Sequence, residues 1–273
     1  MREIGSTNRL SKNTPKETRM AQLEIVTHCY CPPNIPWYAE HLRWQFASLC
    51  LHRLEEVVWS VCYTPSDIAT VRSLEICLAK NKVNHAVKIL PISLEPASLF
   101  RRAIGRNIRA KATRADVVWF TDVDYSFGPD CLDVAVVRLN ECEREENLIF
   151  PAHTWISIDH GIGQNMVKQH MQEACPLVTQ YKAWFKLRAN RTAIGGIQIV
   201  LGDYCREHGY LDGTKWVNPV SVDEGFRQCV CDKRFRRQVG DSVRVEIPNV
   251  YRIRHTEDGR DFDLEGRKGG RVQ

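Results

Sequence analysis

The stretch Ala115–Asp130, A-D-V-V-W-F-T-D-V-D-Y-S-F-G-P-D, decides how the rest of the chain is interpreted. It contains a continuous apolar run, Val117–Phe120, whose residues favour a strand buried on both faces. The apolar run gives way at once to Asp122 and Asp124. Because alternate residues of an extended chain point the same way, these two carboxylates can face one point.

Two carboxylates this close repel each other unless a cation lies between them, and oxygen ligands of this kind suit Mg²⁺ or Mn²⁺. Taken alone, the D-x-D tripeptide is common and more often marks a solvated acidic turn. Gly128-Pro129 turns the chain away soon afterwards. At the end of a buried strand in an α/β pattern, the metal interpretation is favoured.

Strands and helices are predicted to alternate along the chain. Strands are expected at Leu23–Cys29, Val57–Tyr63, Val87–Ile92, Leu148–Ala152, Ala193–Leu201 and Val243–Arg254, and helices at Trp37–His52, Ile68–Ala79, Leu99–Arg114 and Leu132–Glu143. This alternation predicts an α/β fold with a central, mostly parallel sheet flanked by helices. In such sheets ligands bind at the carboxyl ends of the strands.

Length and composition limit the classes of protein that fit. The 273 residues suffice for one large domain, expected over 21–255, between a basic tail over 1–20 and a charged tail over 256–273. The net charge of +5 suits an anionic small molecule and is too small to indicate nucleic acid. No apolar run approaches transmembrane length, and the 11 cysteines include no C-x-x-C pair, so we expect a cytoplasmic protein with free thiols.

The helix predicted over 99–114 has two different faces. One repeats apolar residues every four positions and is expected to be buried; its members are Phe100, Ile104, Ile108 and Ala112. The opposite face carries Arg102, Arg106 and Arg109 with no interleaved acid. A charged helix face is usually just solvated, but guanidinium groups also suit phosphate oxygens. Because this helix leads into the Asp122 strand, its arginines are candidates to flank the same pocket.

Two glycine-containing segments are candidate substrate contacts. Thr154–Asn165 combines an aromatic residue with polar residues and glycines, which suits a mobile loop in which Trp155 stacks on a sugar ring. A plain surface loop is equally allowed. Gly195 and Gly196 open a predicted strand and permit close approach of a ligand or another backbone.

A candidate general base lies near the end of the chain. Ser221 and Glu224 fit a helix capping box, in which Glu224 bonds back to the Ser221 backbone. This leaves Asp223 at a helix N-terminus, where the helix field favours the ionised carboxylate. An ionised carboxylate beside a pocket is what the deprotonation of a hydroxyl requires.

These features, in this order, resemble a nucleotide-sugar-dependent glycosyltransferase of the GT-A type, closest to the large family 2 of inverting enzymes. The resemblance spans about Leu23 to His255. It rests on Thr27 in the first strand, Arg106-Asn107 through Ala115, Asp122-Val123-Asp124, Gly209–Asp212, Trp216, Val222–Phe226 and the late His255. Val222 stands where the family usually has Glu, so Asp223 and Glu224 both remain candidates for the base.

The resemblance implies a Rossmann-like nucleotide-diphospho-sugar transferase fold and sugar transfer from a UDP- or other nucleoside-diphosphate donor to a glycan or other hydroxyl acceptor, with Mn²⁺ or Mg²⁺. The implied metal ligands are Asp122, Asp124 and His255. The implied donor contacts are Thr27, Arg102, Arg106 and Asp122, and the implied substrate contacts are Trp155, Gly195, Gly196, Asp212 and Trp216.

Three alternatives stay open at this point. A sugar-1-phosphate nucleotidyltransferase needs a glycine-rich loop after the first strand, and Thr27–Pro33 contains no glycine. A non-catalytic nucleotide- or glycan-binding domain on a degenerate transferase fold would not need four candidate site residues, Asp122, Asp124, Asp223 and His255. A structural or nucleic-acid partner protein leaves the same residues unexplained.

Overall fold

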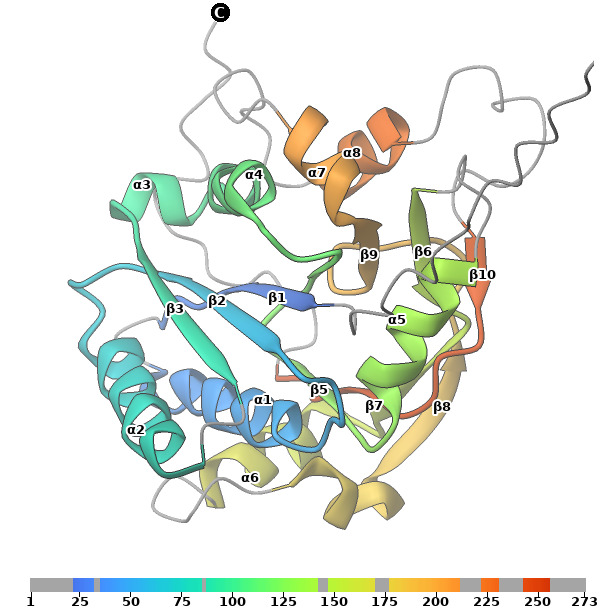
Figure 1. The fold of residues 1–273 in the computed structure, drawn as a ribbon. Coiled ribbons are helices and arrows are strands. Elements are labelled where there is room, and N and C mark those ends of the chain that lie inside the picture. Colours follow the sequence, from blue (N-terminus) through green and yellow to red (C-terminus); the bar gives the residue numbers. More distant parts are fainter. Residues whose placement is uncertain are drawn as a thin grey trace, which may run out of the picture.

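A seven-stranded central sheet organises the protein (Figure 1). The computed structural model describes residues 22–31, 35–84, 87–141, 147–169, 177–211, 222–230 and 243–255. Across the sheet the strands are β10 (Val243–Val245), β6 (Leu148–Pro151), β9 (Gln198–Leu201), β4 (Val117–Phe120), β1 (Leu23–His28), β2 (Val57–Tyr63) and β3 (Lys88–Ser93). Strand β9 runs antiparallel to β4 and β6, and the other pairings are parallel. The predicted mostly parallel sheet is confirmed.

The central strands have the burial that their sequences predict. Every residue of β1 and β4 is buried, and Val117–Phe120 have no exposed surface at all. Leu23 of β1 pairs with Val57 of β2 and Val117 of β4, so these parallel strands end at the same edge of the sheet. The end of β4 therefore delivers Asp122 to the edge where ligands of α/β proteins bind.

A smaller four-stranded sheet packs beside the central one. Its strands, in order, are β5 (Tyr125–Phe127), β11 (Val250–Arg252), β7 (His153–Ser157) and β8 (Phe185–Ala189). The single strand expected over 243–254 is thus two strands in two different sheets. Pro248 has no amide hydrogen for a ladder, and Asn249 has a φ of 57°, so the chain cannot stay extended there.

Helices cover both faces of the central sheet (Figure 1). α3 (Pro96–Leu99), α4 (Arg102–Ala112), α7 (Gly202–His208) and α8 (Val222–Val230) lie above it in this view. The other helical segments are η1 (Pro36–Glu40), α1 (His41–Leu49), α2 (Ile68–Asn84), α5 (Cys131–Glu141), α6 (His160–Gln169) and η2 (Val178–Trp184). None of the helices in the described ranges is long and apolar enough to cross a membrane. The eight cysteines described are free thiols.

The predicted apolar stripe of α4 is wrong. Ile108 is 42% exposed and Ala112 is exposed, whereas Arg106 is fully buried. Gly105 explains how the helix comes so close to the sheet, since a Cβ at this position would lie 2.3 Å from Nε2 of His28. The buried face of α4 is therefore its glycine–arginine face, and this is possible only if the guanidinium groups find partners.

The predicted mobile loop over 154–165 is also wrong. Its first part belongs to β7, which lies between β11 and β8 in the second sheet. Its last part is the start of α6, where Oδ1 of Asp159 accepts a hydrogen bond from the Ile162 amide at 2.7 Å. That contact satisfies an amide at the helix N-terminus. The glycines of this segment lie within the regular helix.

Candidate active site

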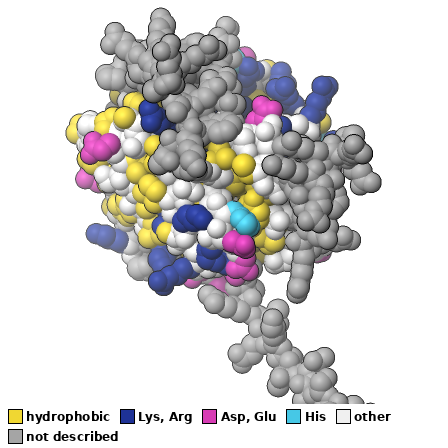
Figure 2. Space-filling view, turned by 90° about the horizontal axis from the view of Figure 1, so that it is seen from above, with side chains coloured by type: hydrophobic (Ala, Val, Ile, Leu, Met, Phe, Trp, Pro, Cys, Tyr) yellow, Lys and Arg dark blue, Asp and Glu magenta, His cyan; other side chains and the backbone are white. Residues whose placement is uncertain are grey.

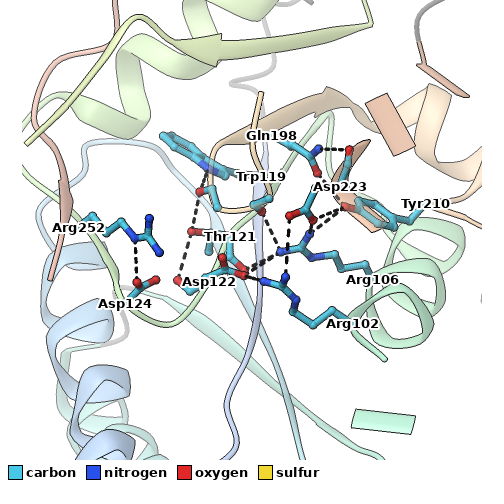
Figure 3. Close-up of polar contacts among 12 residues, drawn as sticks. Arg102, Arg106, Trp119, Thr121, Asp122, Asp124, Gln198, Tyr210, Asp223 and Arg252 are labelled. Carbon is cyan, nitrogen blue, oxygen red and sulfur yellow. Dashed lines mark hydrogen bonds and ion pairs between the residues drawn. The ribbon is translucent and has the colours of Figure 1, made fainter. Parts of the chain in front are cut away.

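The candidate site lies where the central strands end and where α4 and α8 begin (Figure 3). Thr121 and Asp122 follow β4 directly, and Asp223 lies in the first turn of α8. Arg102 and Arg106 reach it from α4. The structure thus brings together residues from three segments of the chain.

Arg106 joins two carboxylates. Its Nη1 donates to Oδ1 of Asp223 at 2.9 Å and its Nη2 to Oδ1 of Asp122 at 3.1 Å. Nη2 also donates to the carbonyl oxygen of Gly195 at 2.8 Å. With no exposed surface, this guanidinium is a fixed bridge between the end of β4 and the start of α8. Such a forked pairing needs arginine rather than lysine.

Arg102 completes this cluster from the more exposed side. Its Nη1 lies 2.5 Å from Oδ1 of Asp122, and its Nη2 lies 3.8 Å from Oδ2 of Asp223. Burial raises the pKa of Asp122, but the charges of Arg102 and Arg106 lower it more, so that it falls well below its usual range. Asp122 is therefore a stable anion held by two cations.

Tyr210 and Gln198 form a hydrogen-bonded chain that links Arg106 to the backbone of Asp223. The Tyr210 hydroxyl accepts a hydrogen bond from Nη1 of Arg106 and donates one to Oε1 of Gln198, both at 2.8 Å. The amide Nε2 of Gln198 then donates to the backbone carbonyl of Asp223 at 3.1 Å. Asp223 is thus tied through both its carboxylate and its backbone.

Asp124 points into a separate part of the site (Figure 3). Its Oδ2 accepts a hydrogen bond from Nε of Arg252 at 2.9 Å and lies 3.9 Å from Nε2 of His255. Its Oδ1 is buried and has no hydrogen-bond partner in the described part of the chain. Burial lowers the pKa of His255, which favours the neutral ring that can act as a ligand.

Asp124 and His255 fit part of a divalent-cation site. A buried carboxylate oxygen without a partner is suited to a cation that takes its remaining ligands from phosphate and water. Asp122 instead faces the α4 arginines. Within the described residues, no three potential ligand side chains gather around one point. The three predicted ligands are therefore divided between two neighbouring positions.

The two glycines bring the backbone close to side chains of the site. A Cβ on Gly195 would lie 2.1 Å from Oδ2 of Asp223, and one on Gly196 would lie 2.1 Å from the Tyr125 ring. The Gly196 carbonyl accepts hydrogen bonds from Oγ1 of Thr121 at 3.0 Å and from the Trp119 indole at 3.2 Å. Both glycines are thus needed for the close packing of the site.

Other predicted residues lie outside this cluster. Thr27 is fully buried near the end of β1. Trp155 lies in β7, where its ring stacks on Tyr251 at 6.4 Å between centroids. Glu224 is exposed on α8, and its carboxylate accepts a hydrogen bond from Gln228 at 3.3 Å. Two predicted substrate contacts and the cap residue are outside the described residues: Asp212, Trp216 and Ser221.

Sequence reasoning missed Tyr210, Gln198 and Arg252 as site residues. Gln198 carried the clearest signal, because one amide inside the apolar run I-Q-I-V-L needs buried partners. Tyr210 lies in the turn after α7, where Gly209 has a φ of 74°. Arg252 stands three residues before His255, but nothing local links it to Asp124.

The surface above α4 and α7 is of mixed character. Figure 2 shows basic, acidic and hydrophobic side chains interspersed over the coloured part of this face.

Comparison with known proteins concerns the fold. No protein-family model matches the chain, and no curated protein matches it either. Among solved structures, the mannosyltransferase PcManGT from Pyrobaculum calidifontis, in complex with GDP-Man and Mn²⁺, matches with a TM-score of 0.53 and 13% identity, over 88% of this chain and 59% of that one. TarS 1–349 from S. aureus matches with a TM-score of 0.53 and 14% identity, over 85% and 60% of the two chains. The complex of TarS 1–349 with UDP matches with a TM-score of 0.53 and 12% identity, over 84% of this chain and 60% of that one.

The chain spans about three fifths of the length of these structures. At such low identity the likeness establishes the fold, and the fold that the sequence predicts is confirmed.

Proposed function

We propose that this chain, which has the fold of GT-A-type glycosyltransferases, transfers a sugar from a nucleoside-diphosphate donor to an acceptor hydroxyl in a metal-dependent, inverting reaction. One observation carries the proposal: the buried Arg106 holds Asp223 beside Asp122 at the carboxyl edge of the sheet. A carboxylate at this position supports the role of a base, because α/β sheets bind nucleotides at this edge. Two of the structural neighbours are complexes with GDP-Man and Mn²⁺ and with UDP, which supports a donor of this class.

The proposed chemistry is a single displacement. The acceptor oxygen forms a bond to the anomeric carbon of the sugar as its proton passes to the Asp223 carboxylate. The bond from that carbon to the diphosphate breaks, and its electron pair goes to the leaving phosphate oxygen. Attack from the face opposite the leaving group inverts the configuration at this carbon. Asp223 suits this role better than Glu224, since only Asp223 faces the cluster.

Charge balance explains why a cation is proposed. Three carboxylates and three guanidinium groups already pair with one another: Asp122, Asp124 and Asp223 with Arg102, Arg106 and Arg252. A diphosphate therefore enters a site without spare positive charge, and its own charge needs neutralising. Asp124 and His255 are the residues that would hold a divalent cation. When bound, the cation supplies Lewis-acid stabilisation of the leaving diphosphate.

Calorimetric titration with nucleoside diphosphates, with and without Mn²⁺, tests donor binding. We expect one nucleotide to bind at least about tenfold more tightly with Mn²⁺. Equal affinity in EDTA would contradict the metal dependence, and no binding of any nucleotide would contradict the donor class.

Release of the donor's sugar then tests catalysis. We expect turnover with a matching nucleotide sugar, lost by orders of magnitude in Asp223→Asn and retained in Glu224→Gln. Binding without any turnover would identify a non-catalytic domain on this fold. A reversed effect of the two substitutions would make Glu224 the base.

A further inference from the structure

Asp223 is held more firmly than a solvent-facing base needs to be. Oδ1 accepts a hydrogen bond from Nη1 of Arg106 at 2.9 Å and lies 3.3 Å from the Tyr210 hydroxyl oxygen. Its backbone carbonyl receives the Gln198 amide. The carboxylate is therefore fixed in both position and rotation by groups that come from α4, β9 and the turn after α7.

The two oxygens of this carboxylate have different surroundings. Oδ1 accepts the 2.9 Å hydrogen bond from Arg106 and lies 3.3 Å from the Tyr210 hydroxyl, whereas Oδ2 lies 3.8 Å from Nη2 of Arg102. A hydroxyl has one proton, and Tyr210 has its shorter acceptor in Gln198 at 2.8 Å. The hydrogen bond from Arg106 makes Oδ1 the oxygen that stays unprotonated.

We propose that Tyr210 and Gln198 are positioning residues: Tyr210 acts through Arg106, and Gln198 acts through Tyr210 and the Asp223 backbone, to present Oδ2 of Asp223 as the atom that takes the acceptor's proton. This inference rests on the proposed function, because it assigns a role within that reaction. Tyr210 does not touch the substrate in this scheme. It orients the Arg106 guanidinium, and the orientation of the guanidinium sets the direction of the Asp223 carboxylate.

Tyr210→Phe removes the hydroxyl and keeps the packing. The Tyr210 ring stacks on Phe226 at 3.9 Å and meets Phe120 edge-on at 4.7 Å. A phenyl ring can make both contacts, so this variant is expected to fold. The loss is confined to hydrogen bonds around a charged pair, which are the bonds that matter most for orientation.

We expect Tyr210→Phe to lower kcat by about 10- to 100-fold, because a small displacement of a reacting group has an effect of this size. Affinity for the nucleotide with Mn²⁺ should stay within about threefold, since the change acts on the base and not on the donor site. Combined with Asp223→Asn, Tyr210→Phe should have no further effect on kcat, as expected for two residues acting as one unit.

Tyr204→Phe is the matched control. Its hydroxyl donates a hydrogen bond to the Cys229 carbonyl at 3.0 Å. Tyr204 therefore also contacts α8, but at the C-terminal end of the helix, whereas Asp223 lies at the N-terminal end. This variant should retain the kcat of the wild-type protein. If both tyrosine variants lower kcat equally, the Tyr210 hydroxyl only stabilises α8 and the positioning role is refuted. A Tyr210→Phe protein with wild-type kcat refutes it as well.

A readout without turnover separates this inference from the proposed function. The carboxyl carbon of Asp223, labelled with ¹³C and assigned by its loss in Asp223→Asn, reports the surroundings of the carboxylate by NMR. We expect its signal to shift in Tyr210→Phe and to stay in place in Tyr204→Phe. A shift in a protein that turns over no donor would show that the proposed reaction is wrong while the contact holds. An unchanged signal would overturn the positioning role whatever the activity.

Discussion

Gly195→Ala should reduce catalysis through a direct collision with Asp223. The new Cβ would lie 2.1 Å from Oδ2 and 2.4 Å from Cγ of Asp223, whereas ordinary contacts begin at 3.4 Å. The carboxylate and the methyl group must therefore separate by about 1.3 Å. Asp223 cannot rotate away without breaking its bond to Arg106, and the Gly195 carbonyl is itself bound to that guanidinium at 2.8 Å.

A displacement of about 1 Å at a reacting group costs on the order of 100-fold in rate, which corresponds to about 2.7 kcal/mol in the barrier. The overpacking itself should lower the free energy of unfolding by about 1–3 kcal/mol. Steady-state turnover of the donor measures the first effect and denaturant unfolding the second. Gly161→Ala is the control, because the nearest atom to its new Cβ, in an exposed part of α6, is 3.3 Å away. Wild-type kcat in Gly195→Ala would refute the placement of Asp223 at the reacting centre.

Three other perturbations test separate parts of the molecule. Asp124→Asn should weaken Mn²⁺-dependent nucleotide binding by at least about tenfold, as measured by calorimetry, while circular dichroism shows that the fold is retained. Unchanged binding would exclude Asp124 as a metal ligand. Arg109→Gln should lower the free energy of unfolding by about 3 kcal/mol, because it leaves the buried Glu24 without its 2.7 Å ion pair, and denaturant titration should show this with nucleotide affinity unchanged. Burial lowers the pKa of His28 and His41, so the unfolded chain takes up protons that the folded chain does not. The free energy of unfolding should therefore fall as the pH drops below about 6.5, by up to about 1.4 kcal/mol per histidine and pH unit. Equal urea midpoints at pH 7.5 and pH 5.5 would contradict this.

The central sheet could be predicted because its strands are buried on both faces. Such strands contain continuous apolar runs, and the run over Val57–Tyr63 coincides with β2 as observed. The second sheet could not be predicted in the same way. Strand β8 reads F-K-L-R-A with four exposed residues, and β11 has three residues that pair with β5 more than a hundred positions away. Short strands with distant partners leave little trace in a local pattern.

The base candidates show what a local pattern can and cannot distinguish. The sequence places Asp223 and Glu224 together at a helix start, and the structure has α8 begin at Val222. Consecutive helical residues point about 100° apart, so only one of the two can face the cluster. That one is Asp223, and the choice depends on the position of α8 relative to α4 and not on the motif. The catalytic role of Asp223 stays a prediction.

The arginines of α4 show the same dependence on long-range contacts. A helix face with Arg102, Arg106 and Arg109 and no acid one turn away has no internal partners. Such a face must be solvated, bind anions, or meet acids from other elements. The structure realises the third possibility: Arg102 and Arg106 meet Asp122, and Arg109 meets Glu24 of β1. With its partners, the Arg106 guanidinium is fully buried, whereas Ile108 on the same helix is 42% exposed. The orientation of the helix is therefore the reverse of the one expected. An arginine face that lacks local acids is therefore a reason to search the ends of neighbouring strands for carboxylates before assigning it to a phosphate.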